Sequence, residues 1–246
     1  EPLLKWFESN KHRDIPSQEK HLPLGKYAET LLLFYLENHD HFQLLSHSLQ
    51  LNQEKITIGE LDYLFSKEGD EHAIHLELAI KFYLKVERDG TEVYLGPSTK
   101  DWMKRKLVKL FSHQLQLPHQ RKDLLPSSLQ KLDFTSQLYL KGTLFLPYNE
   151  WEMERQNPLN CGWWIIIEEL DLILNKKYHY SVITKKADWI FPFNSRHPLY
   201  QKDEFSLQSN QMLEGRDEIM LCRFDENKKV LDRGFVMRAN WPQEQL

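Results

Sequence analysis

Residues 72–87, HAIHLELAIKFYLKVE, form the longest run of alternating apolar and polar residues in the chain. Successive side chains of a β-strand point to opposite faces, so such a run predicts a strand. One predicted face is wholly apolar and holds Ile74, Leu76, Leu78, Ile80, Phe82, Leu84 and Val86. The other face holds His75, Glu77, Ala79, Lys81, Tyr83 and Lys85. We therefore expect a fold built around a sheet that contains this strand.

The remaining elements follow from the same reading of periodicity and turn residues. Helices are predicted over 24–38, about 100–115 and 203–214. Strands are predicted over 49–52, 56–65, 91–95, 137–147, 162–167, 178–184, 218–224 and 230–237, and the last two form a hairpin. The segments 8–23 and 117–136 are predicted to be irregular, since they are polar or interrupted by proline.

The composition indicates a compact globular protein. Hydrophobic residues make up 41% and aromatic residues 12% of the 246 residues, which is enough for a sizeable core. A net charge of −4 argues against a protein held on nucleic acid by overall charge alone, but says little against a local basic groove. The two cysteines, Cys161 and Cys222, indicate a reduced, cytoplasmic protein with structural thiols. The apolar runs are too short for a transmembrane helix, and the first residues do not read as a signal peptide.

Carboxylates on two neighbouring predicted strands are candidates for a catalytic site. Glu77 and Lys81 share the polar face of the long strand, about 13 Å apart at Cα. If the segments 56–65 and 72–87 pair as antiparallel neighbours, Asp62 lies beside Glu77. Two carboxylates with a lysine nearby form an oxygen site that suits Mg²⁺ or Mn²⁺. Such a metal can activate a water molecule and offset the charge of a phosphoryl group.

A polar strand face is also typical of the solvated side of a half-exposed sheet, where Glu and Lys form surface ion pairs. Two positions favour a functional site. Asp62 lies inside the apolar run 61–65, and Glu29 lies near the apolar stripe of the helix over 24–38. Charges in such surroundings are costly unless they are paired or bound to a metal. His75 is predicted either to support the site or to lie at the surface.

The predicted order of helix, three strands, helix and strand, with 91–95 as an extra short strand, resembles the PD-(D/E)XK phosphodiesterase superfamily. The segments LGKYAETLLLFYL, TIGELDYLF, HLELAIKFYL, YLGPSTKD, KLVKLFSHQL and KGTLFLP are more narrowly similar to an uncharacterised bacterial group, domain-of-unknown-function family 1853. This resemblance implies an α/β (α+β) fold with a restriction-endonuclease-like core over 1–147. A mixed C-terminal extension over 148–246 is expected to pack on that core as one globular unit.

The resemblance also implies roles for individual residues. Asp62 and Glu77 would be the ligands of Mg (or Mn), and Lys81 would be the catalytic cation. Glu29 would be a supporting carboxylate, and Gln114 resembles the glutamine that orients substrate or water in many such nucleases. The implied reaction is hydrolysis of phosphodiester bonds in nucleic acid.

One departure from the superfamily motif keeps a second function open. The motif places its lysine two residues after the second acid, where this chain has Ala79. Lys81 would then be a migrated lysine, on the same strand face one pleat further on. The alternative is a catalytically inactive module of the same fold that binds nucleic acid or a protein partner.

A basic segment follows the short strand over 91–95. Lys100, Lys104 and Arg105 could contact a phosphate backbone, and Trp102 could stack on a base. A solvated helix face is the alternative interpretation. The triplet His39-Asp40-His41 is predicted to be a solvated turn, because adjacent residues seldom converge on one ion. The tryptophans Trp163, Trp164 and Trp189 are predicted to pack in the interior.

Overall fold

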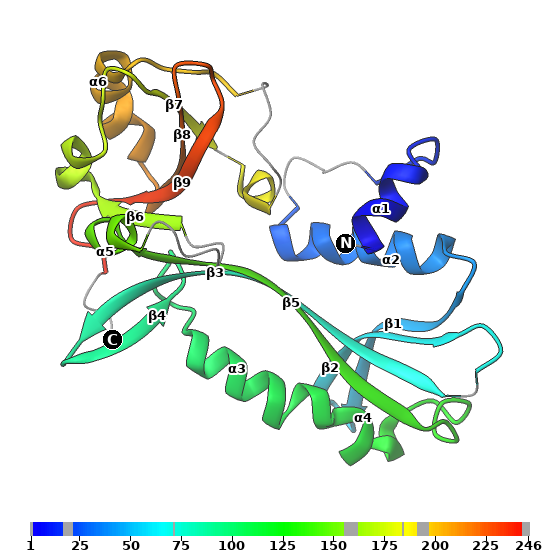
Figure 1. The fold of residues 1–246 in the computed structure, drawn as a ribbon. Helices are drawn as coiled ribbons and strands as arrows, with labels where there is room; N and C mark the ends of the chain where they lie inside the picture. Colours follow the sequence, from blue (N-terminus) through cyan, green and yellow to red (C-terminus); the bar gives the residue numbers. More distant parts are fainter. Residues whose placement is uncertain are drawn as a thin grey trace. The chain divides into compact units, whose positions relative to one another are not determined.

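The computed structural model describes residues 2–16, 22–70, 72–154, 162–183, 185–190 and 197–242, and Figure 1 shows its ribbon. The α-helices are α1 (Pro2–Ser9), α2 (Leu24–Asn38), α3 (Met103–Ser112), α4 (Leu117–Gln120), α5 (Tyr148–Met153) and α6 (Lys202–Leu213). The strands are β1 (Phe42–Gln53), β2 (Ile56–Lys67), β3 (Ala73–Arg88), β4 (Thr91–Leu95), β5 (Phe134–Pro147), β6 (Gly162–Ile166), β7 (His179–Ile183), β8 (Glu218–Phe224) and β9 (Val230–Met237). Short 3₁₀ turns are η1 (Gln114–Gln116), η2 (Lys122–Leu124), η3 (Ile167–Leu172) and η4 (Lys186–Ile190).

Hydrogen bonds connect the strands into a mixed sheet in the order β1-β2-β3-β5-β6-β9-β8-β7, with β4 paired to β3. The fold is therefore of the mixed α/β class, as the sequence predicts. The chain divides into two compact units, 1–80 with 106–141 and 81–105 with 142–246. The strands β3 and β5 each begin in the first unit and end in the second. The predicted domain boundary at 147 coincides with the end of β5 and stays a prediction.

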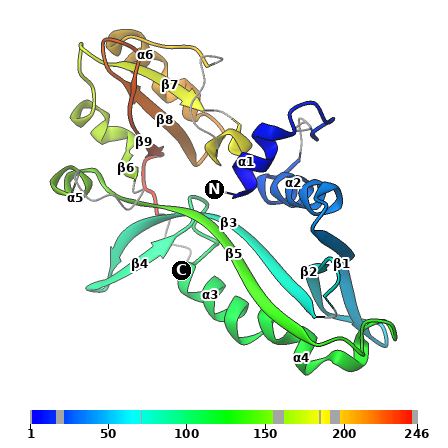
Figure 2. The ribbon, with the colours of Figure 1, turned by 45° about the vertical axis from the view of Figure 1, so that its right-hand side comes forward.

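In the first unit, helical segments cover both faces of the β1-β2-β3 meander (Figures 1 and 2). On one face, the α2 residues Leu32 and Leu36 pack with Tyr63 and Phe65 of β2. On the opposite face, Leu64 lies in a cluster with residues of α4 and of the loop that follows it, among them Leu117, Leu125 and Leu129. Since consecutive strand residues alternate between faces, the two clusters define the two sides of this sheet.

The strands β2 and β3 pair antiparallel, which confirms the pairing that the candidate site requires. The register places Tyr63 opposite Leu76 and Leu64 opposite His75. Continued by one residue, this register places Asp62 opposite Glu77.

The face of β3 that carries His75 and Glu77 is not solvated, contrary to the surface-ion-pair interpretation. His75 is 0% and Glu77 1% exposed, and Ala79 is buried beside them. The apolar residues of the other face, Ile74, Leu76 and Leu78, are only partly buried against α2. The polar face is buried because the segment after α3 packs over it, which periodicity within the strand cannot indicate.

Several elements differ from the sequence predictions. The segment 117–136, predicted to be irregular, contains the short helix α4, and α5 lies where no element was predicted. The helix α1 occupies residues where no element was expected. The strand β1 starts at Phe42 rather than at residue 49, because a register shift near Leu44 and a positive φ at Ser48 interrupt the alternation of its side chains. The helix α3 ends at Ser112, so Gln114 lies in η1 rather than in a helix. No helix among the described residues is long and apolar enough to span a membrane.

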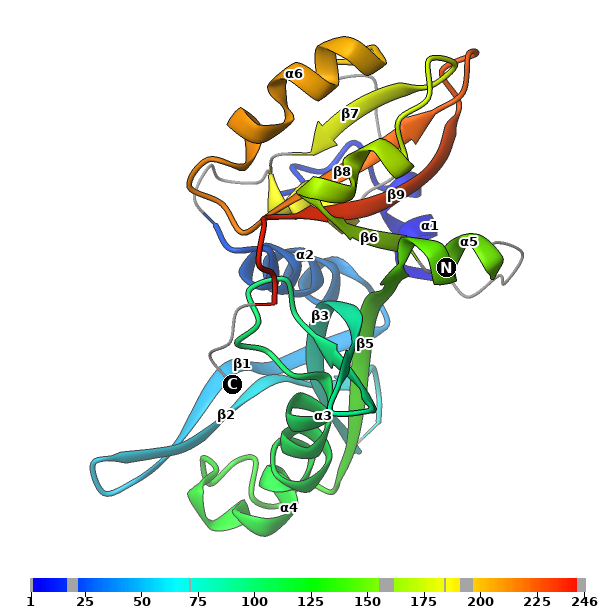
Figure 3. The same ribbon diagram turned by 90° about the vertical axis from the view of Figure 1, so that its left-hand side faces the viewer.

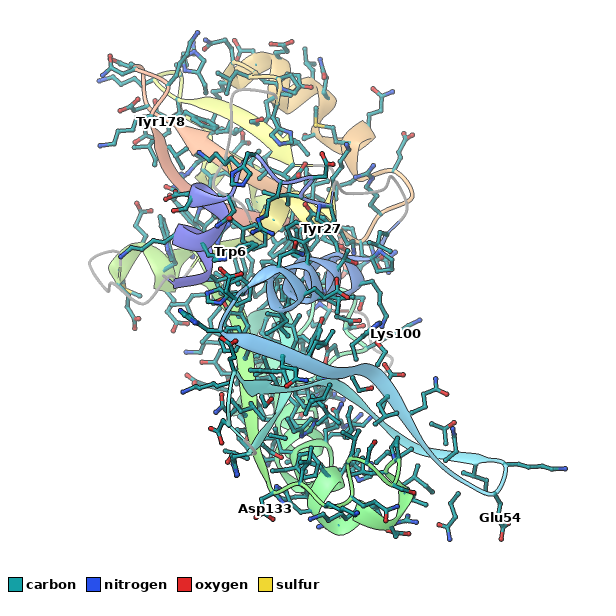
Figure 4. The ribbon with its side chains drawn as sticks, turned by 90° about the vertical axis from the view of Figure 1, so that its right-hand side faces the viewer. Trp6, Tyr27, Glu54, Lys100, Asp133 and Tyr178 are labelled. Carbon is teal, nitrogen blue, oxygen red and sulfur yellow. The ribbon has the colours of Figure 1, made fainter. Side chains whose placement is uncertain are left out.

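The hairpin between β1 and β2 turns at Glu54, which has a φ of 56° and is labelled at the hairpin tip in Figure 4. Neighbouring residues at this tip are exposed. The candidate residues Asp62 and Glu77 therefore belong to the opposite, buried part of the same meander.

The second unit has its own core. Its strand β6 runs parallel to β5 and β9, whereas β8 runs antiparallel to β9 and β7. The helix α6 lies beside β7 (Figure 3), where the rings of Tyr180 and Phe205 stack with centroids 5.3 Å apart. Arg223 of β8 is 2% exposed and forms a two-point ion pair with Asp232. Four aromatic rings lie within 6 Å of its guanidinium, those of Tyr148, Trp151, Trp163 and Tyr178.

Candidate active site

The Glu77 carboxylate is the centre of a buried hydrogen-bond network in the first unit. Its Oε1 lies 2.9 Å from His75 Nε2, and its Oε2 accepts a hydrogen bond of 2.8 Å from Gln114 Nε2. His75 reaches Glu77 along β3 itself, whereas Gln114 is brought in by η1, which packs on β2. The structure therefore brings together two of the predicted site residues, Glu77 and Gln114.

The network continues from His75 towards the surface. His75 Nδ1 lies 3.1 Å from the hydroxyl oxygen of Ser136 on β5. That hydroxyl oxygen also lies 3.3 Å from Nε2 of His119, an exposed residue of α4. Sequence reasoning missed Ser136 and His119, because nothing in the pattern of β5 or α4 sets them apart from solvated polar residues.

Asp62 lies next to this network and is anchored to the neighbouring strand. Its Oδ2 accepts a hydrogen bond of 2.9 Å from the backbone N–H of Leu78. Burial raises the pKa of Asp62 to about 7, and the charge of Glu77 contributes to this rise. The Leu78 N–H opposes the rise, because it stabilises the ionised form. Asp62 and Glu77 thus form a pair of nearby carboxylates in surroundings that disfavour two negative charges.

Glu29 of α2 contributes a third negative charge at the margin of the site. Its charge adds to the raised pKa of Asp62, and its backbone carbonyl accepts a hydrogen bond of 2.6 Å from the Tyr63 hydroxyl. The Glu29 side chain is 27% exposed and lies 2.6 Å from the ammonium of Lys26. The hydrogen bond from Lys26 to Glu29 raises the pKa of Lys26 above its usual value. The charge of Glu29 is therefore paired rather than buried.

The oxygen atoms available at this site fit a hard divalent cation. The Oε1 atom of Gln114 is buried, and within the described parts of the chain no donor reaches it. The donor atoms that this carbonyl and the Asp62 and Glu77 carboxylates offer are all oxygens, the donor type that Mg²⁺ and Mn²⁺ prefer. The described residues contain no cluster of three or more His, Cys, Asp or Glu side chains placed to hold a metal. A cation held by the two carboxylates would therefore take its remaining ligands from Gln114 and from water.

Lys81 belongs to the second unit, where its ammonium contacts the Asp101 carboxylate. The hydroxyl of Tyr83 donates to the other oxygen of the same carboxylate at 3.3 Å. Burial and the Asp101 charge raise the pKa of Tyr83, so its hydroxyl keeps its proton. Lys81, the catalytic cation that the resemblance implies, thus forms an ion pair with Asp101. The sequence pattern did not single out Asp101.

The predicted nucleic-acid contacts Lys100, Lys104 and Arg105 are exposed. The guanidinium of Arg105 lies 4.7 Å from the ring centroid of Trp102, and that of Arg88 lies 5.7 Å from it. Trp102 therefore already has cationic partners from its own chain, whereas a base-stacking platform needs an open ring face.

The histidine triplet, the tryptophans and the cysteine singled out in the sequence have surroundings typical of structural residues. The backbone N–H of His41 donates to His39 Nδ1 at 3.2 Å, so the His39–His41 triplet closes a turn. Trp163 and Trp189 are buried, as predicted, whereas Trp164 is only partly buried. Burial raises the pKa of the Cys222 thiol to about 12, which suits a structural cysteine. Cys161 lies outside the described residues.

A protein-family model described as Domain of unknown function (DUF1853) matches residues 2–237, and the chain therefore belongs to this family. No curated protein and no solved structure matches the chain significantly.

Proposed function

We propose that this member of the DUF1853 family is a cytoplasmic, metal-dependent phosphodiesterase that hydrolyses nucleic acid. The observation that supports this proposal best is the pair of carboxylates on adjacent strands, the half-buried Asp62 and the buried Glu77. A fold gains no stability from placing a nearly unexposed Glu77 beside an aspartate whose pKa is raised to about 7. Carboxylates with strongly shifted pKa values are characteristic of functional sites.

The order of elements in the first unit supports a restriction-endonuclease-like topology as part of the same proposal. The helix α2 precedes the strands β1, β2 and β3, and β5 follows after α3, with the short strand β4 inserted before α3 and the short helix α4 after it. This is the order of helix, three strands, helix and strand that the resemblance implies. The candidate acids lie on the second and third of these strands, where the superfamily motif requires them.

The chemistry of the proposed reaction is divided between the metal and the side chains. When bound, Mg²⁺ supplies an activated water and offsets negative charge at the phosphorus. Asp62 and Glu77 would hold the cation, and the Gln114 amide holds the Glu77 carboxylate in one orientation. In this proposal Lys81 is the catalytic cation, as the resemblance implies. Its ammonium also contacts the Asp101 carboxylate, which would compete with the substrate for it.

The test is metal-dependent cleavage of single-stranded DNA, double-stranded DNA and RNA by the purified full chain. We expect cleavage with Mg²⁺ or Mn²⁺ but not with EDTA, and we expect Asp62→Asn and Glu77→Gln to lose it. Glu54→Gln is the matched control, because Glu54 is a carboxylate at the exposed tip of the same hairpin, away from the site. Cleavage that survives in either site variant, with the fold intact by circular dichroism, would contradict the proposal.

The second candidate is an inactive module of the same fold that binds nucleic acid or a protein. It is favoured by Ala79, which is 4% exposed at the position of the motif lysine, and by the ion pair that engages Lys81. This candidate predicts no cleavage with any metal, but binding of labelled nucleic acid that weakens with salt. Replacement of Lys100, Lys104 and Arg105 by alanine should then weaken binding uniformly across sequences.

A further inference from the structure

His75 is a buried polar residue to which the proposed chemistry assigns no role. Its side chain is 0% exposed, and both ring nitrogens have partners, Glu77 and Ser136. A buried imidazole with two partners has a fixed ring plane, because rotation of the ring would break both contacts at once.

The donors in the network can be assigned from the chemistry of its members. An ionised carboxylate only accepts hydrogen bonds, so when Glu77 is in its ionised, metal-binding form the hydrogen of the 2.9 Å contact lies on His75 Nε2. Glu77 Oε2 likewise takes the amide N–H of Gln114. Both donors converge on Glu77, one on each carboxylate oxygen. Each oxygen keeps a second lone pair, which is the one that a metal ion would use.

We propose that His75 is the positioning residue of Glu77. Its Nε2–H fixes the orientation of the carboxylate, and the Ser136 hydroxyl holds the imidazole ring in place from β5. This inference rests on the proposed function for its metal, since a ligand carboxylate gains affinity when a partner outside the coordination shell fixes its direction. His119 is the exposed end of the same network, next to Ser136.

The proton on Nε2 can be tested without any metal. Long-range ¹H–¹⁵N correlation spectra of the metal-free full chain, assigned with a His75→Gln variant, report which nitrogens of His75 carry hydrogen. We expect a protonated Nε2 in the wild type, and a change in the His75 signals in Ser136→Ala. An unprotonated Nε2 in the wild type would overturn the inference, because His75 would then accept from Glu77 rather than donate to it.

The consequence for metal binding is tested by titration calorimetry with Mn²⁺ alone. We expect His75→Leu to weaken binding by about 10–100-fold, the usual effect of removing such a partner. His75→Gln should restore part of the affinity, because its amide N–H can replace the Nε2–H donor. His72→Gln is the matched control, since His72 contacts Thr135 at the same strand pair but does not reach Glu77.

The outcomes separate the inference from the proposed function. A wild type that binds Mn²⁺ with the same affinity as a folded His75→Leu overturns the inference and leaves the proposed function standing. A wild type that binds no Mn²⁺ overturns the proposed function, and the spectra of the metal-free chain then decide on their own whether His75 positions Glu77.

Discussion

Replacement of Asp62 by asparagine should stabilise the metal-free protein at neutral and alkaline pH. The introduced amide keeps an oxygen that can accept the hydrogen bond from the Leu78 N–H, so the contact between β2 and β3 survives. What disappears is the negative charge, which burial and the charge of Glu77 disfavour. The variant therefore removes an electrostatic cost and leaves the packing of the strands unchanged.

The size of the effect follows from the raised pKa. The interval between 3.8 and about 7 corresponds to about 4 kcal/mol, at about 1.4 kcal/mol per pH unit. Water reaches part of the Asp62 side chain and relieves part of the cost, so we expect about 2–4 kcal/mol. Below about pH 4, Asp62 is protonated in the folded and the unfolded chain, and the advantage of the variant is absent. Between about pH 4 and 7 only the folded chain keeps the proton, so the stability of the wild type falls relative to the variant. Above about pH 7 the difference is constant.

The assay compares amide hydrogen exchange of β2 and β3 residues in the wild type and in Asp62→Asn. These amides report unfolding of the first unit itself, and a comparison at one pH cancels the intrinsic exchange rate. Measurements at about pH 5 and pH 8 in EDTA should show a larger protection gain for the variant at pH 8. A protection gain of the variant that is the same at both pH values would refute the reasoning. Lower protection of the variant than of the wild type at pH 8 would refute it as well. If Asp62 binds Mn²⁺, addition of the ion should make the wild type better protected than the variant, because only the wild type would be stabilised.

The other predictions concern the second unit. Gly234→Ala should destabilise the protein by about 1–3 kcal/mol in thermal denaturation, because a Cβ there would lie 2.1 Å from the neighbouring indole ring. Arg223→Met should cost about 3–5 kcal/mol, because the buried Asp232 would lose its ion pair with the guanidinium. A second change, Asp232→Leu, should recover part of this loss in urea denaturation, but not all of it, because the indole N–H of Trp163 would lose its acceptor. Asp101→Asn should increase acetylation of Lys81 by an amine-reactive reagent, measured by mass spectrometry, because the ammonium loses its ion pair. An unchanged modification rate would show that this ion pair does not engage Lys81 in solution.

The elements of the fold were predictable because local patterns specify them. The alternation in residues 72–87 and the turn residues of the C-terminal hairpin locate β3, β8 and β9 to within one residue. The extent of β1 was not predictable, because the register shift near Leu44 moves side chains to the other face and interrupts the alternation. A bulge depends on the partner strand, which the periodicity of one segment does not contain.

Which face of β3 is buried could not be predicted for a similar reason. The apolar face packs on α2, but the polar face is covered by η1, α4 and the loop that follows, far along the chain. The partners of the charged residues on β3 are equally distant: Ser136 for His75, and Asp101 for Lys81. Alternation predicts that His75 and Glu77 share a face, but only tertiary packing decides whether that face meets water or protein.

Asp62 and Glu29 show that a charge among apolar neighbours has different consequences on a strand and on a helix. Both residues lie among apolar neighbours in sequence, and both were singled out on that ground. A side chain on a strand stays on its own face of the sheet, so Asp62 remains next to Glu77 with a raised pKa. A helix allows a long side chain near its stripe to reach the surface, where Glu29 pairs with Lys26. A charge within an apolar run is therefore a stronger sign of function on a central strand than on a helix, and Asp62 rather than Glu29 is the residue whose replacement should reveal the site.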